Sequence, residues 1–296
     1  MSATIIDGLK CAAEIRQEAK LETDELKSQG VDPCLAVVLV GDNPASKAYV
    51  GSKVKACAEV GIQSIKETPN ADISQKELLS IIDTLNADNS VHGILVQLPL
   101  PHHIDENTVI ERIDPKKDVD GFHPINAGKL MIGLECLTPC TPSGIPELIT
   151  RSGLTMEHKS AVILGRSNIV GKPLMNILVQ KGAQANCTVT CCHSGTQHLE
   201  KFTREADILI AAIGVPEFVT AGMVKDGAIV IDVGINRVDD IEHSRGYRLV
   251  GDVAFDEVKE VASAITPVPG GVGPMTVAML MKNTVKAAGM LHEFSK

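Results

Sequence analysis

The sequence predicts an α/β protein of two lobes around a cleft. Its 296 residues are 44% apolar, which is enough to form two hydrophobic cores of ordinary size. In both halves of the chain, short apolar runs typical of buried parallel strands alternate with stretches of helical periodicity. This alternation favours parallel sheets whose strands are joined by helices.

The second lobe is organised around an apolar run at residues 161–164, which ends in a glycine turn and continues into a helix. Gly165 permits a tight turn, and Gly171 lets the helix approach the strand closely. The N–H groups at such a helix start attract an anion. The turn predicts a nucleotide site in a Rossmann-like, doubly wound parallel sheet. A strand-to-helix turn without a ligand is the alternative, because the spacing G-x-S-x-x-x-G-x-P departs from G-x-G-x-x-G.

Composition and charge disfavour two classes of partner. The formal net charge of −9 would repel phosphates, which argues against a general nucleic-acid or anionic-membrane surface. No apolar run reaches membrane-spanning length, and the first residues lack the basic region and apolar core of a signal peptide. We therefore expect a cytoplasmic protein that binds neither nucleic acid nor membranes.

The eight cysteines fit a reducing compartment, where thiols serve as small apolar residues. Neither Cys136 with Cys140 nor Cys191 with Cys192 has the C-x-x-C spacing of a metal site. Neither a disulfide nor a bound metal is expected.

The first lobe is expected to begin with a short edge strand and to continue as alternating strands and helices. Gly30 ends the first helix, and Ser46 is expected to cap the second. The expected strands are 4–7, 35–40, 62–66 and 92–98, and the expected helices are 10–29, 46–61 and 74–86.

Four polar residues of this lobe are candidates for chemistry. Tyr49 and Lys53 stand one turn apart on one helix face, at the carboxyl end of the preceding strand. Gln97 lies near a later strand end, and Asp120 lies in a charged, turn-rich loop. Each has a structural alternative: a solvated lysine beside a half-buried tyrosine, a glutamine bonded to loop backbone, and an Asx turn with Gly121.

The second lobe continues with an expected helix at 174–180 and strands at 187–192, 208–213 and 228–233. No acidic residue ends the strand 187–192, where NAD-binding proteins place the carboxylate that binds the ribose 2′-hydroxyl. Arg166 and Ser194 could instead hold the 2′-phosphate of NADP. The site therefore favours NADP.

A proline- and glycine-rich segment, 266–276, precedes the last helix, expected over 277–291. Such a backbone permits close approach to a ligand, although an interdomain hinge is the alternative. Before this segment, residues 251–253 are expected to end a strand, with the capping of a helix at 255–262 as the structural role of Asp252. Residues 239–246 are charged and are expected to be exposed.

Five motifs occur in the order found in one enzyme family and span nearly the whole chain. They are Y-V-x-x-K at 49–53, V-Q-L-P-L-P at 96–101, K-D-V-D-G at 117–121, G-R-S at 165–167 with Gly171 and Pro173, and P-V-P-G-G-V-G-P at 267–274. The chain thereby resembles the bifunctional methylenetetrahydrofolate dehydrogenase/cyclohydrolases, the FolD family. The resemblance implies that NADP⁺ takes a hydride from 5,10-methylenetetrahydrofolate, and that water opens the resulting methenyl cation to 10-formyltetrahydrofolate. Both steps would share the cleft between the lobes.

The resemblance also assigns residues. It implies Lys53 as the principal catalytic residue, Gln97 as the partner that tunes it, Tyr49 as a stacking partner of the aminobenzoyl ring, and Asp120 as a pterin ligand. The implied folate site further includes Val96, Leu98, Pro269, Gly270 and Gly271, and the implied NADP site consists of Gly165, Arg166, Ser167, Ser194 and Ile235.

General chemistry agrees with the implied role of Lys53. Ring opening needs proton transfers at nitrogen and oxygen, and a lysine amine performs them near neutral pH where a neighbouring cation favours its neutral form. The methenyl product is such a cation. Hydride transfer needs only orientation of cofactor and folate. Lys53 is therefore expected to matter most for hydrolysis.

The chain departs from many relatives at one cofactor position. They carry Lys or Arg after the His-Ser pair that ends the second strand, whereas Gly195 follows Ser194 here. Arg166 is thus left with more of the phosphate recognition.

Two other classes are considered. A shikimate-dehydrogenase-like NADP oxidoreductase would reduce a small keto acid and would leave Tyr49 without an aromatic partner. A folate or dinucleotide sensor without catalysis would be expected to lack Lys53 or Gln97, and both are present.

The proline-rich boundary at 138–142 divides the chain into two expected domains. Residues 1–138 form a folate-binding catalytic domain on which the C-terminal helix 275–296 packs back, and residues 139–274 form an NADP-binding domain. The resemblance implies tetrahydrofolate derivatives as substrates, a homodimer formed through the cofactor lobe, and a place in one-carbon metabolism and purine biosynthesis.

Overall fold

The computed structural model describes residues 2–240 and 246–294. Residues 241–245, part of the segment expected to be charged and exposed, lie outside the described residues. The chain divides into two compact units. The first, here termed the six-stranded unit, comprises Met1–Ala12 and Thr141–Thr276, and the second, the three-stranded unit, comprises Ala13–Cys140 and Val277–Lys296.

The sheet of the three-stranded unit is parallel, in the order β3-β2-β4. The central strand β2 (Cys34–Val38) is buried along its whole length, between β3 (Gln63–Glu67) and β4 (Gly93–Val96). Strands β3 and β4 lie on opposite sides of β2, so the direction in which successive strands are added to the sheet reverses at β2. Ligands bind at such a switch point, beyond the carboxyl ends of the strands.

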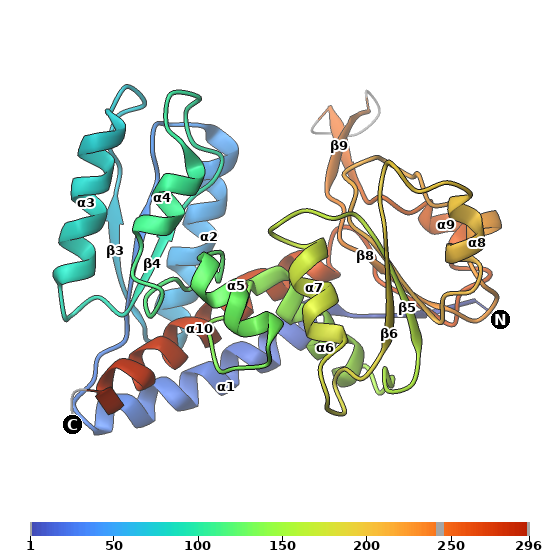
Figure 1. Cartoon of the computed structure of the whole chain (residues 1–296), viewed down its shortest axis with the longest axis horizontal. Helices are drawn as coiled ribbons and strands as arrows, with labels where there is room; N and C mark the ends of the chain where they lie inside the picture. Colours follow the sequence, from blue (N-terminus) through green and yellow to red (C-terminus); the bar gives the residue numbers. More distant parts are fainter. Residues whose placement is uncertain (1, 241–245, 295–296) are drawn as a thin grey trace. The chain divides into compact units, whose positions relative to one another are not determined.

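Helices α3 (Gln75–Ala87) and α4 (Glu106–Arg112) lie beside this sheet (Figure 1). Buried residues of both helices, among them Ile82 and Val109, join strand residues such as Ile94 in one apolar cluster. The other helices with residues in this unit are α1 (Gly8–Ser28), α2 (Pro44–Val60), α5 (Pro124–Met131) and α10 (Val272–Phe294).

Helix α2 begins two residues before the expected cap, Ser46. Its first residue is Pro44, whose fixed φ suits a helix start. The side-chain oxygen of Asn43 accepts a hydrogen bond from the Ser46 backbone N–H at 3.1 Å. Asn43 therefore takes the capping role that the sequence interpretation gave to Ser46.

The six-stranded sheet is parallel, in the order β1-β11-β8-β7-β5-β6. Its switch point lies between β5 and β7, because the chain goes from β5 out to β6 and returns to β7 on the other side. The fold class, two α/β units with a Rossmann-like sheet in one of them, is thus confirmed. The strands are β1 (Thr4–Ile5), β5 (Ser160–Leu164), β6 (Thr188–Cys192), β7 (Ile208–Ala211), β8 (Ile229–Asp232) and β11 (Ala264–Ile265).

The helices of this unit are short except for α6. They are α6 (Cys140–Arg151), α7 (Gly171–Leu178), α8 (Leu199–Thr203), α9 (Phe255–Val258) and the 3₁₀ turn η1 (Ala221–Met223). Among the residues that the structure describes, no helix is both long enough and apolar enough to cross a membrane.

The N-terminal strand belongs to the six-stranded unit, which differs from the expected 1–138 domain. Thr4 pairs with Ala264 and Ile5 with Ile265, at the edge of the large sheet. A two-residue strand carries no pattern that reveals its neighbour, since its partner lies about 260 residues away in the chain.

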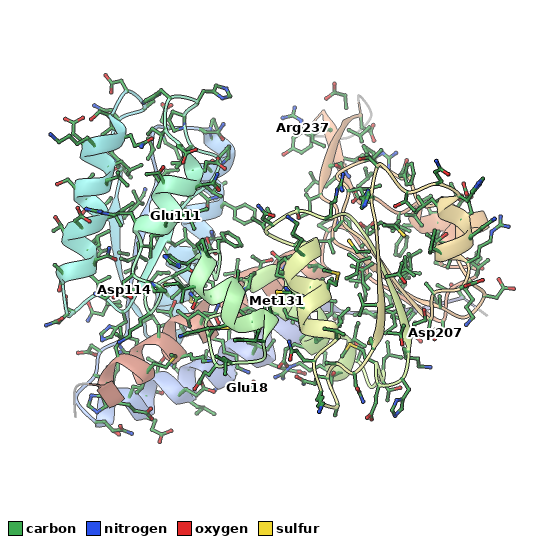
Figure 2. The ribbon with its side chains drawn as sticks, viewed as in Figure 1. Glu18, Glu111, Asp114, Met131, Asp207 and Arg237 are labelled. Carbon is green, nitrogen blue, oxygen red and sulfur yellow. The ribbon has the colours of Figure 1, made fainter. Side chains whose placement is uncertain are left out.

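The strand expected to end at 251–253 is β10 (Tyr247–Val250), but its antiparallel pairing with β9 (Asn236–Asp239) was not expected. Arg237, labelled in Figure 2, stacks its guanidinium over the Tyr247 ring, 4.1 Å from the ring centroid. Cross-strand cation–π pairs of this kind stabilise short ribbons.

Candidate active site and cofactor site

Lys53 and Gln97 meet at the switch point of the three-stranded sheet. Lys53 lies on α2, is 5% exposed, and donates from Nζ to Oε1 of Gln97 at 3.0 Å. The Gln97 backbone N–H donates to the Val38 carbonyl at the end of β2, and its Nε2 donates to the Leu98 carbonyl at 2.7 Å. These bonds fix the amide with its oxygen toward the lysine.

Tyr49 lies one turn before Lys53 and is 43% exposed. Lys53 Nζ lies 5.6 Å from the centroid of the Tyr49 ring. Because much of the ring is open to solvent, it offers a surface on which a planar aromatic group can stack. Val96, buried at the end of β4, and the half-buried Leu98 flank Gln97.

Hydrogen bonds of Lys117 and Asp118 hold the loop that carries Asp120. Lys117, 4% exposed, donates from Nζ to the carbonyls of Asn86 and Asp88, each at 2.8 Å, and to a third carbonyl at the end of α3. Asp118 accepts from the His123 N–H at 2.8 Å. The backbone on both sides of Asp120 is thereby fixed.

Asp120 itself lies close enough to Lys53 for their charges to interact. Removal from water raises the pKa of the Asp120 carboxyl to about 6, the positive charge of Lys53 acts against this, and Asp118 adds to it. A carboxylate of this kind accepts hydrogen bonds from N–H donors above that pH and loses this capacity below it.

In the six-stranded unit, a cavity of about 450 Å³ opens at the carboxyl ends of β5, β6 and β7. Four of the five predicted cofactor residues line it, together with residues of the β7 end such as Ile213 and Val215. The four are Gly165, Arg166, Ser167 and Ser194.

The glycine turn has the predicted geometry. Gly165 has φ +117°, and a Cβ there would collide with the Ala212 carbonyl oxygen. A Cβ at Gly171 would collide with the Gly165 carbonyl oxygen, so only glycine lets α7 start this close to β5. Ser167 Oγ accepts from the N–H groups of Val170 at 3.1 Å and of Gly171 at 3.4 Å, which leaves its own proton available to a ligand.

The fifth predicted cofactor residue, Ile235, lies elsewhere. It lines a second cavity of about 260 Å³ with the predicted folate residues Pro269, Gly270 and Gly271. The structure therefore brings one cofactor residue together with three folate residues of the same unit. Ile235 is 50% exposed, so its side chain is open to a ligand.

Asp252 does not have the capping role expected from the sequence. Helix α9 has no side-chain hydrogen bond at its N-cap, Ala254. Asp252 Oδ2 instead accepts from the backbone N–H groups of Ile213 at 2.7 Å and Gly214 at 2.9 Å. Those partners lie about 40 residues away in sequence, whereas capping concerns neighbours. Gly251, directly before Asp252, is a local signal of close packing, because a Cβ there would collide with the Asp232 carboxylate.

The cysteines are all free thiols, and seven are buried. Burial raises the pKa of Cys140 well above its usual range, and its Sγ donates to the Val119 carbonyl at 3.3 Å. Within 2–240 and 246–294, no group of three or more His, Cys, Asp or Glu side chains is placed to hold a metal ion.

Together, the doubly wound sheet with its glycine turn and the buried lysine at a second switch point define a two-domain, dinucleotide-binding enzyme. Residues 6–120 match the family model "Tetrahydrofolate dehydrogenase/cyclohydrolase, catalytic domain", and residues 139–292 match the "NAD(P)-binding domain" of the same name. The chain belongs to the tetrahydrofolate dehydrogenase/cyclohydrolase family.

Proteins named "Bifunctional protein FolD" are similar over almost their full length. The one from Brevibacillus brevis is 57% identical over 288 residues, which cover 97% of this chain and 98% of that protein. The one from Syntrophobacter fumaroxidans is 55% identical over 289 residues, 97% of each chain.

Solved structures agree. The FolD enzyme of Campylobacter jejuni superposes with a TM-score of 0.92 at 52% identity, covering 98% of this chain and 99% of that one. The Trypanosoma brucei dehydrogenase-cyclohydrolase, solved with NADP cofactor and an inhibitor, has a TM-score of 0.91 at 39% identity, with 98% of each chain covered.

The likeness to shikimate dehydrogenase, a class considered from the sequence, concerns the fold alone. The Thermus thermophilus enzyme is 14% identical, with a TM-score of 0.50 over 87% of this chain and 99% of that one.

Proposed function

We propose that this chain oxidises 5,10-methylenetetrahydrofolate with NADP⁺ and hydrolyses the methenyl product to 10-formyltetrahydrofolate. The observation that carries the proposal is the buried Lys53 amine hydrogen-bonded to the Gln97 amide, in a chain that belongs to this family. The substrates are tetrahydrofolate derivatives, and the reaction belongs to one-carbon folate interconversion.

The residues of the larger cavity fit NADP. Gly165 and Gly171 let α7 start close to β5, where a Cβ would collide with backbone, and the N–H groups at this helix start suit a pyrophosphate. Arg166 supplies a cation and Ser194 a hydroxyl for the 2′-phosphate, and no carboxylate stands there to repel it. The bound cofactor accepts the hydride, and this chain's contribution to that step is orientation.

We assign the proton transfers of ring opening to Lys53. As water adds to the methenyl carbon, the neutral amine takes one of the water protons. The ammonium so formed gives that proton to N5 as the bond between carbon and N5 breaks, and the hydroxyl proton leaves to solvent as the formyl group forms. Gln97 holds the amine in place through both transfers.

Folate binding is assigned to side chains around the lysine. Tyr49 stacks on the aminobenzoyl ring, and the Asp120 carboxylate accepts from the pterin N–H groups. Val96 and Leu98 are assigned to the same site, and Pro269, Gly270 and Gly271, which line the smaller cavity of the six-stranded unit, are also assigned to folate.

The proposal includes a cytoplasmic homodimer. Eight free thiols suit a reducing compartment. Strand β6 is an edge of the six-stranded sheet, and an unpaired edge can pair with a second copy through the cofactor unit. Light scattering on the purified protein gives the mass, and a monomer would contradict this part.

A spectroscopic assay of the purified protein with 5,10-methylenetetrahydrofolate and either NADP⁺ or NAD⁺ tests the function. Reduced cofactor and the methenyl intermediate are followed separately. We expect NADPH to form without build-up of the methenyl species and NAD⁺ to be the poorer substrate. Methenyl accumulation would contradict the hydrolytic half, and absence of turnover with either cofactor would contradict the proposal as a whole.

A further inference from the structure

Two aspartates at the carboxyl end of the six-stranded sheet are buried and, within the described part of the chain, form no ion pair with a basic side chain. Asp232 ends β8 and is 3% exposed, and Asp252 follows β10 and is fully buried. Burial of a carboxylate is costly unless hydrogen bonds replace the lost water. Each of these accepts three.

Asp252 forms hydrogen bonds to segments that line each of the two cavities described above. Its Oδ2 accepts from the N–H groups of Ile213 and Gly214, at the end of β7, where Ile213 lines the larger cavity. Its Oδ1 accepts from Nδ2 of Asn236 at 2.9 Å, and Asn236 directly follows Ile235, which lines the smaller cavity. One side chain thus fixes both strand ends.

Asp232 holds the backbone of Asp252 in place through hydrogen bonds. Its carboxylate accepts from the backbone N–H groups of Asp252 at 2.9 Å and of Val253 and Gly234 at 3.0 Å. Its own N–H donates to Thr266 Oγ1 at 2.7 Å, at the end of β11. The pair therefore connects the ends of β7, β8 and β11.

Two glycines make room for these carboxylates. A Cβ at Gly234 would collide with the carboxylate of Asp252, and a Cβ at Gly251 would collide with that of Asp232. Neither glycine has a positive φ, so the space, and not the backbone conformation, requires glycine. The packing of backbone and carboxylates is therefore specific.

We propose that Asp252, held by Asp232, is a positioning residue for the dinucleotide: it sets the strand ends of β7 and β8 that receive the cofactor's nicotinamide half. In doubly wound sheets the two halves of a dinucleotide lie on either side of the switch point, here between β5 and β7. This inference rests on the proposed function and deepens it. Asp252 acts on the cofactor, so its loss should reduce cofactor binding more than the ring opening at Lys53.

The test uses Asp252→Ala and Asp252→Asn in the full chain, with Asp256→Ala as a control at an exposed carboxylate four residues away. Three quantities are measured: the Kd for NADPH by fluorescence, the hydrolysis of 5,10-methenyltetrahydrofolate without cofactor, and hydrogen exchange of the Ile213 and Gly214 amides. Cofactor binding and amide exchange need no folate, so they report on this inference even if the proposed function fails.

We expect Asp252→Ala to weaken NADPH binding about tenfold or more, because the N–H groups of Ile213 and Gly214 lose their charged acceptor. Exchange of the two amides should accelerate, and the hydrolysis rate should fall by a smaller factor than the affinity for NADPH. Asp252→Asn keeps an oxygen for both N–H groups and should restore most of the affinity, and Asp256→Ala should match the wild type.

Wild-type NADPH affinity in Asp252→Ala, or an equal loss of cofactor binding and hydrolysis, would overturn the inference. Should Asp252→Ala fail to fold, Asn236→Ala decides, since it removes only the donor to Oδ1. A loss of NADPH affinity of about threefold or more that exceeds any loss of hydrolysis supports the role, and unchanged affinity or an equal loss of both overturns it.

Discussion

Lys53 donates its hydrogen bond to an amide oxygen, and this choice of partner matters for its chemistry. The Gln97 amide oxygen accepts from the Lys53 amine at 3.0 Å, so the nitrogen that transfers protons has a fixed position. The Leu98 carbonyl in turn fixes which end of the Gln97 amide faces the lysine. A proton-transfer residue needs such a fixed position within reach of the reacting atoms.

Asp120 should give folate binding a pH dependence. Its pKa of about 6 means that the carboxyl is charged at neutral pH and becomes protonated on acidification. The pterin N–H groups need a charged acceptor, so affinity for tetrahydrofolate should fall about tenfold per pH unit below about pH 6. Anaerobic calorimetric titrations between about pH 5.5 and 8 measure this.

Asp120→Asn is the matched comparison for that titration. The amide keeps one acceptor oxygen and does not titrate, so the variant should bind more weakly at neutral pH and show a flat profile. A wild-type affinity that stays constant over this range, or a variant that keeps the wild-type slope, would count against the assignment of Asp120 to the pterin.

At the scale of elements, Lys117 links helix α3 to the loop that carries Asp120. Its ammonium satisfies three carbonyls at the C-terminal end of α3, where a helix otherwise leaves acceptors unpaired. The same residue's backbone carbonyl accepts from the Ile94 N–H of β4 at 2.7 Å. Helix, strand and loop are thus joined at one residue.

Lys117→Met should lower the free energy of unfolding by about 2 to 3 kcal/mol, because three carbonyls, one of them in a buried hydrogen bond, lose the charged donor of a buried side chain. Urea denaturation followed by circular dichroism measures the difference. Lys116→Met is the control, since that neighbouring side chain is exposed and its replacement should change stability by less than about 0.5 kcal/mol. Equal stability of the two variants would show that the α3 contacts contribute nothing.

The elements with strong local signals were predictable. The strand, glycine turn and helix around Gly165 and Gly171 follow from steric requirements that the residue types express directly. The end of β10 was predicted, but β9 and its pairing with β10 were missed because both strands are short and only half-buried and lack the apolar run that marks a buried strand.

The candidate site was predictable in so far as it lies on such elements. The helix spacing of Tyr49 and Lys53 and the strand-end position of Gln97 place these residues at the switch point where the structure has them. Asp252 was misinterpreted as a cap, because its partners come from a distant strand and no local pattern encodes them.

At the scale of the whole molecule, the two proposed activities draw on different units. Proton transfer relies on Lys53 in the three-stranded unit, whereas the cofactor residues, from Gly165 to Ile235, belong to the six-stranded unit. The chain passes from one unit to the other several times. Thr4, for example, lies near the N-terminus but belongs to β1, which pairs with β11 in the six-stranded unit, and the local sequence pattern does not predict this pairing. Damage to one unit's chemistry should therefore leave the other's ligand binding intact.

The most direct test of this account is the rate of 5,10-methenyltetrahydrofolate hydrolysis by Lys53→Met, compared with Lys55→Met. Lys55 is exposed and lies two residues further along the same helix. We expect Lys53→Met to lose about 10²- to 10⁴-fold in ring-opening rate while it still binds folate, and Lys55→Met to keep the wild-type rate. Ring opening by Lys53→Met at the rate of Lys55→Met would contradict the central claim that Lys53 carries the proton transfers.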